Sequence, residues 1–99
     1  MNNHLDMNLS DEQKKWIKDL SSLFYSPSKI ATITGIDKDE MKHGMMDTDS
    51  EIYKCYYGGQ FESEAKLRRS ILKLATAGSS PGQTIAIKML DECRREETR

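Results

Sequence analysis

The fold of this chain is decided by residues 25–37, which read Tyr25-Ser26-Pro27-Ser28-Lys29-Ile30-Ala31-Thr32-Ile33-Thr34-Gly35-Ile36-Asp37. Ser26 is a residue type that caps helices, and Pro27 suits the first helical turn, where a backbone N–H would have no partner. Gly35 then tolerates the left-handed backbone with which many helices end. These signals predict a short helix over 27–34 that stops at the glycine.

A second helix is expected directly after this turn. Asp37 and, three residues later, Glu40 form the pattern of a helix start, which predicts a helix over 38–46. Ala31 is small enough to let two steeply crossing helices approach each other. Two short helices joined by a glycine turn are the plan of a helix-turn-helix, and proteins with this motif often place the second helix in a DNA groove.

Composition indicates a single all-α domain. The chain has 99 residues, of which 36% are hydrophobic and 31% charged, and only two are prolines. No stretch alternates β-branched and polar residues over a strand's length. Further helices are predicted at 10–25, 49–77 and 81–96. Their starting signals are Ser10-Asp11-Glu12-Gln13 and Thr48-Asp49-Ser50-Glu51, which read as capping boxes, and Ser80-Pro81, with Ser80 as the cap.

The predicted architecture is a three-helix head that contains the helix-turn-helix, followed by a long antiparallel helical hairpin. Residues 1–9 are expected to be a disordered leader, residues 10–47 the head, and residues 48–99 the hairpin and oligomerisation region. Only Gly78-Ser79-Ser80 separates the last two helices, and so short a connection favours antiparallel neighbours.

The exposed residues near the starts of helices 27–34 and 38–46 are the candidate DNA contacts. They are Ser28, Lys29, Lys38, Lys42 and His43. The charge balance argues against strong binding, because the chain carries a net charge of −1 and DNA-binding domains are usually basic. Alternatively, these lysines are ordinary surface residues, and Asp37 and Glu40 only complement the helix dipole.

An apolar stripe on the long helix is the candidate oligomer interface. Its proposed residues are Tyr56, Phe61, Leu67 and Ile71. The aromatic residues beside Gly58-Gly59 suit either a core or a subunit interface. The methionines of 38–46 are expected to fill the core. A basic cluster, Lys66, Arg68, Arg69 and Lys73, is either a second phosphate-contacting face or pairs with Glu62 and Glu64.

Several function classes find no support in the sequence. There is no P-loop and no recognisable nucleophile motif, so we expect no enzymatic activity and no cofactor. His4 and His43 have no partners at metal-ligand spacing, which predicts no metal site. No apolar run is long enough to span a membrane, and no signal peptide is evident. Cys55 and Cys93 fit reduced thiols better than a secreted disulfide scaffold, so a cytoplasmic location is expected.

Three stretches resemble phage terminase small subunits and related prophage helix-turn-helix proteins. The first is Ser26 to Asp37. The second, residues 56–71, resembles the pattern Tyr-x-x-Gly, a short spacer, Glu, then Leu-Arg-x-x-Ile. The third is the helix break Leu74-Ala75-x-x-Gly78-Ser79-Ser80-Pro81, after which Gly82 departs from an expected alanine. The resemblance implies double-stranded DNA recognition by the head, ring-like homo-oligomerisation through the hairpin, and a large, ATP-hydrolysing terminase subunit as a further partner.

Two functions therefore stay open. One is a DNA-binding, non-enzymatic phage protein that recognises DNA for packaging. The alternative is a helical protein-interaction or oligomerisation module whose helix-turn-helix-like head does not bind DNA.

Overall fold

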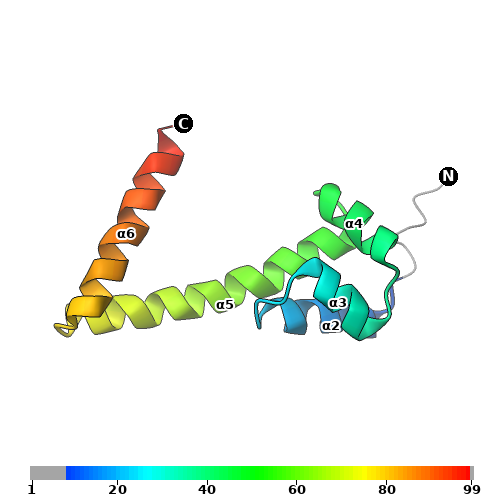
Figure 1. Ribbon diagram of the computed structural model, residues 1–99, viewed down its shortest axis with the longest axis horizontal. Coiled ribbons are helices and arrows are strands. Elements are labelled where there is room, and N and C mark those ends of the chain that lie inside the picture. Colours follow the sequence, from blue (N-terminus) through cyan, green and yellow to red (C-terminus); the bar gives the residue numbers. More distant parts are fainter. Residues whose placement is uncertain (1–8, 99) are drawn as a thin grey trace. The chain divides into compact units, whose positions relative to one another are not determined.

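The computed structural model describes residues 9–98, and within that range the chain is helical without any strand (Figure 1). The helices are α2 (Asp11–Ser21), α3 (Pro27–Thr34), α4 (Lys38–Met46), α5 (Glu51–Thr76) and α6 (Ser80–Glu97). The all-α prediction is confirmed. The bounds of α3 and α4 coincide with those predicted, while the predicted leader lies almost wholly outside the described residues.

Helix α2 begins as predicted and ends earlier than predicted. Ser10 and Gln13 form a complete capping box, with both backbone-to-side-chain hydrogen bonds at 3.0 Å. The helix then closes in a Schellman-type turn, in which the Tyr25 N–H donates to Leu20 O and Phe24 adopts a left-handed backbone with φ of 67°. The prediction of a helix to residue 25 is therefore wrong at its C-terminal end. Leu23 and Phe24 consequently lie exposed in a loop.

The connection between α3 and α4 follows the predicted chemistry. The Ser26 hydroxyl accepts from the Lys29 N–H at 3.3 Å, and Gly35 (φ 77°) donates its N–H to Ala31 O at 2.9 Å. The Asp37 carboxylate accepts from the N–H groups of Asp39 and Glu40 at 2.8 and 3.1 Å. Two helices of eight and nine residues are thus joined by three residues, which is the helix-turn-helix plan.

Helix α5 is capped by Ser50, so the prediction of Thr48 as cap is wrong. The buried Ser50 hydroxyl accepts from the Tyr53 N–H at 3.0 Å and donates to Gly44 O at 2.6 Å. One side chain therefore satisfies an N–H at the start of α5 and a carbonyl near the end of α4. This pair of hydrogen bonds fixes the junction between the two helices.

The head core includes the first half of α5. Its buried residues are Ile17, Ile30, Ala31, Ile36, Met41, Ile52 and Tyr56. The chain forms two compact units, divided between Glu64 and Ala65. The predicted boundary at 47/48 is therefore too early, because Ile52 and Tyr56 fill the space between the three short helices. Figure 1 shows α2, α3 and α4 gathered around this part of α5.

The second unit contains the end of α5 and all of α6. Gly78 (φ 103°) and the Ser79 N–H, which donates to Leu74 O at 3.0 Å, close α5 in another Schellman-type turn. Ser79 caps α6 by accepting from the Gly82 N–H at 3.1 Å, so the predicted cap Ser80 is wrong by one residue.

Within this unit the two helices touch at the turn. A Cβ atom at Gly82 would lie 3.0 Å from Ala75 N, and Gln83 Nε2 donates to Ala75 O at 3.1 Å. Beyond the turn, α6 and the end of α5 in this unit (residues 65–76) diverge (Figure 1), so the predicted antiparallel pairing is not observed within it. The large apolar side chains of this unit remain largely exposed; they include Leu67, Leu72, Leu74, Ile85, Ile87 and Leu90. We call these six residues the uncovered apolar surface.

Candidate nucleic-acid interface

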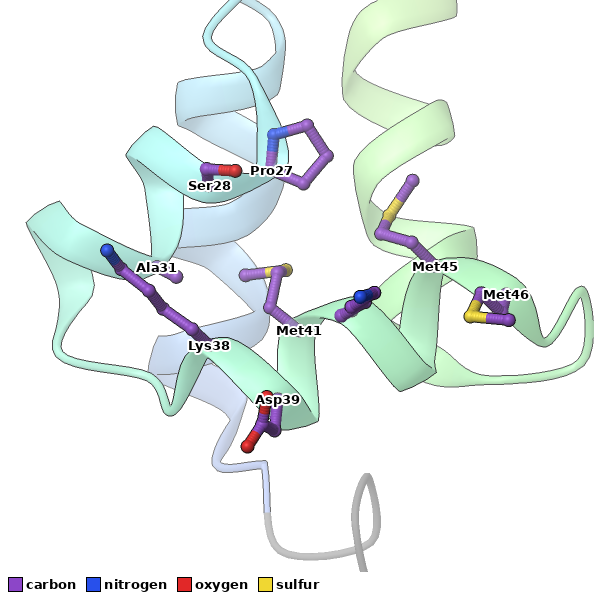
Figure 2. Close-up of a pocket in the computed structure, with 9 residues that line it drawn as sticks. Pro27, Ser28, Ala31, Lys38, Asp39, Met41, Met45 and Met46 are labelled. Carbon is purple, nitrogen blue, oxygen red and sulfur yellow. The ribbon is translucent and has the colours of Figure 1, made fainter.

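Three of the five predicted DNA contacts line one pocket on the head. Ser28 comes from the first turn of α3, and Lys38 and Lys42 lie one turn apart on α4. The pocket has a volume of about 510 Å³ and opens between the two helices (Figure 2). Its remaining lining residues are Pro27, Ala31, Asp39, Met41, Met45 and Met46.

The opposite faces of α3 and α4 hold this surface in place. Ile30, Ala31 and Met41 are each at most 2% exposed and belong to one core cluster. Gly44 lets α4 approach α5, because a Cβ there would lie 2.6 Å from Ile52 Cβ. A rigid buried face fixes which side chains of α4 point outward.

Lys29 and His43 are exposed but do not line the pocket. His43 Nδ1 lies 2.7 Å from Asp39 O, and because a carbonyl oxygen only accepts hydrogen bonds, Nδ1 carries the proton. That bond holds the imidazole against its own helix. The second ring nitrogen, Nε2, is then the atom with which His43 can contact a ligand.

Acidic side chains share α4 with these bases. Asp37 is engaged as the N-cap, so its carboxylate oxygen is directed at backbone N–H groups. Asp39 lines the pocket beside Lys38, and Glu40 is half-buried. The local positive charge is consequently small, and any phosphate at this surface would also meet a nearby carboxylate.

Sequence reasoning missed the exposed methionines of the pocket. Met41 is a core residue as predicted, but Met45 is half-buried and Met46 is 76% exposed, so core filling is wrong for Met46. The helical repeat could have predicted that Met46 differs from Met41. Counting from the buried Met41, positions 44 and 45 share its face, whereas position 46 does not. Figure 2 shows Met45 and Met46 on the last turn of α4.

The four predicted interface residues differ in their exposure. Tyr56 is a core residue, 6% exposed, and its hydroxyl donates to Tyr25 O at 3.1 Å, so it is unsuited to a subunit interface. Phe61 and Leu67 are exposed, and Ile71 is half-buried. Phe61 also ends a row of ring contacts on α5, with centroid distances of 4.6 Å for Tyr53–Tyr57 and 5.4 Å for Tyr57–Phe61.

Two groups of the head, the half-buried Cys55 and the buried Tyr56, have altered acidity. Burial raises the pKa of the Cys55 thiol above its ordinary value, and the carboxylate of Glu51 raises it further. Burial, with a smaller contribution from Tyr57, also raises the pKa of the Tyr56 hydroxyl. Neither group lines the pocket, and both stay protonated at neutral pH.

A second, smaller hollow lies between α2 and α3. Its volume is about 340 Å³, and it is lined by Trp16, Asp19, Leu20, Ile33 and Thr34. None of the predicted site residues contributes to it. Trp16 and Ile33, at this hollow, are 40% and 51% exposed.

No similar protein was found that could identify this site. No group of three potential metal ligands forms among residues 9–98, and none of the helices described is apolar enough over a sufficient length to cross a membrane. No protein-family model, curated protein or solved structure matches this chain.

Proposed function

We propose that this chain is a non-enzymatic protein that binds double-stranded DNA through α3 and α4 and self-associates through residues 65–98. This is the behaviour implied by its resemblance to phage terminase small subunits. The observation that carries the proposal is the pocket of the head, where Ser28, Lys38 and Lys42 from two helices surround one exposed surface. In a helix-turn-helix these are the positions that meet the DNA backbone and groove.

Self-association is supported by the uncovered apolar surface. Each of its six side chains is between 44% and 58% exposed, although they lie in a stretch of only 35 residues. Monomeric soluble proteins rarely leave so many large apolar side chains uncovered in one region. A second copy of the chain is the proposed cover, and this arrangement would bring several heads together.

Self-association would also compensate for the low positive charge of a single head. One head carries few lysines on its outer face, and the adjacent carboxylates weaken their effect on phosphates. Several heads linked in one oligomer bind a single duplex with a gain in effective concentration. Weak contacts by each head therefore suffice. The large terminase subunit remains a further proposed partner that rests on the resemblance alone.

The alternative is a protein-interaction module. Its specific support is the apolar character of the pocket, to which Met41, Met45, Met46, Ala31 and Pro27 contribute. Methionine-rich surfaces adapt to varied apolar partners. On this alternative Lys38 and Lys42 would pair with acidic side chains of the partner.

Retention on duplex DNA at low salt distinguishes the two functions. We expect the Lys38→Glu, Lys42→Glu double variant to lose retention, because two phosphate contacts become repulsive. The matched control is Lys15→Glu, Lys54→Glu, which makes the same change in charge at exposed positions of the head outside the pocket. If both double variants were retained equally on duplex DNA, the pocket would not be the DNA-contacting surface. Absence of retention by the native oligomer would favour the protein-interaction module.

A further inference from the structure

The exposed residues of α3 and α4 are unusual for a surface that reads bases. The helices have the sequences PSKIATIT and KDEMKHGMM, which contain no arginine, asparagine or glutamine. Arginine or lysine binds guanine through two hydrogen bonds, and asparagine or glutamine binds adenine in the same way. Of these residue types α3 and α4 offer only lysine, and the proposed function places the lysines on phosphates, so base recognition would fall to other exposed side chains.

Met46 is the outstanding candidate for that contact. Among the large apolar side chains of residues 9–98, it is the most exposed, at 76%. It lies on the last turn of α4 at the rim of the pocket, together with Met45, while Lys38 and Lys42 line the same pocket (Figure 2).

The major groove offers only one apolar group to such a side chain. The four base pairs present hydrogen-bond donors and acceptors there, and thymine alone adds a 5-methyl group. A flexible thioether gains from packing against that methyl and gains nothing from the polar edges of guanine or cytosine. If the lysines contact phosphates, the thymine 5-methyl group is the part of a base that Met46 can contact.

We propose that Met46, supported by Met45, contacts thymine 5-methyl groups, so that the head prefers thymine-containing duplexes. This inference rests on the proposed DNA binding and specifies the feature of DNA that the head recognises. It assigns positioning to Lys38 and Lys42 and selectivity to the methionines. The separation of roles leads to distinct effects for the two kinds of substitution.

The test compares two duplexes that differ only in the methyl group. One is an A·T-rich duplex several helical turns long, and the other has the same sequence with uracil in place of every thymine. The native oligomer, at low salt, should bind the uracil duplex about fourfold more weakly for each methyl group that a methionine no longer meets. Met46→Ala should reduce binding to the thymine duplex and bring the ratio of the two affinities close to one.

Two controls separate this contact from other causes. Leu23→Ala, at another exposed apolar residue of the head, should leave the ratio unchanged. Lys42→Glu should weaken binding to both duplexes by the same factor.

A native ratio near one, with clear retention of both duplexes, would overturn the inference and leave the DNA-binding proposal standing. The same ratio in native protein and Met46→Ala would assign the preference to duplex shape and overturn it too. Retention of neither duplex would overturn both proposals.

Discussion

Gly59 on α5 lies directly against Lys18 on α2, so closely that a Cβ atom at Gly59 would overlap the Lys18 carbonyl oxygen and the Ser21 hydroxyl. The adjacent Gly58 has open space where its Cβ would be. The two neighbouring glycines thus have different roles. Gly59 permits the contact between the two helix backbones, whereas Gly58 leaves α5 without a good helix former at an exposed position.

Alanine substitutions should therefore have opposite effects at these two positions. Gly59→Ala is expected to lower the free energy of unfolding of the head by about 3 kcal/mol, because the rigid backbone of α2 must move. Gly58→Ala should raise it by about 0.5–1 kcal/mol through helix propensity. Urea unfolding followed by fluorescence of Trp16, the single tryptophan, measures both. Similar effects at both positions would contradict the close contact.

The Ser50 hydroxyl should be a large contributor to the stability of the head. Ser50→Ala removes the cap of α5 and leaves the Gly44 carbonyl without its buried donor, which should cost about 2 kcal/mol. Thr48→Ala is the control, since Thr48 is exposed and would matter only if it were the cap. A larger loss of unfolding free energy for Thr48→Ala than for Ser50→Ala would restore the sequence-based assignment.

Stability of the head should fall in alkaline solution. The pKa values of Cys55 and Tyr56 are raised in the folded state above ordinary values of 9.0 and 10.0. The unfolded chain therefore loses these protons at lower pH than the folded one, so the folded state is favoured below pH 9 and progressively less as the pH rises. Urea unfolding at a series of pH values should show the decrease. Tyr56→Phe should reduce its slope above pH 10, and an unchanged slope would count against the assignment to Tyr56.

Local signals were sufficient to predict α3, α4 and their turn. Ser26, Gly35 and Asp37 each act within four residues along the chain, and the hydrogen bonds they make are those their side chains and backbone favour. For the same reason Ser28, Lys38 and Lys42 could be assigned to one surface from the sequence alone. The geometry of a short helical connection follows from local chemistry.

The errors arose where the outcome depends on a backbone conformation or a contact that the local side-chain pattern does not contain. Phe24 continues the apolar pattern of α2 but adopts a left-handed backbone. Phenylalanine rarely adopts this conformation, so the sequence does not predict it. Ser50 prevails over Thr48 because its hydroxyl also reaches Gly44 O, six residues away. Tyr56 was grouped with the interface because only the folded head shows its bond to Tyr25 O.

Disrupting the uncovered apolar surface should yield monomers. Leu67→Glu with Leu74→Glu places two charges where a second copy is proposed to pack, and both side chains are exposed, so the head should keep its fold. Light scattering at about 100 μM, where a complex with a Kd of about 10 μM is mostly formed, should show the native oligomer and a monomeric variant. Leu23→Glu, in the exposed loop of the head, is the control and should remain oligomeric. A native protein that stays monomeric at this concentration would refute self-association.

The salt dependence of DNA binding should report both the lysines and the assembly. Each of Lys29, Lys38 and Lys42 that contacts a phosphate contributes to the slope of log affinity against log salt, so replacing one by alanine should flatten that slope by about one unit per head engaged. In the oligomer several heads contribute, and the native slope should be correspondingly steep.

The monomeric Leu67→Glu, Leu74→Glu variant should show a shallow slope and far weaker retention, because the gain in effective concentration disappears while each head is unchanged. Binding titrations over a range of salt concentrations, on one fixed duplex, provide all these slopes. If the monomeric variant bound with native affinity and slope, the head would read DNA alone and the proposed role of assembly in binding would be wrong.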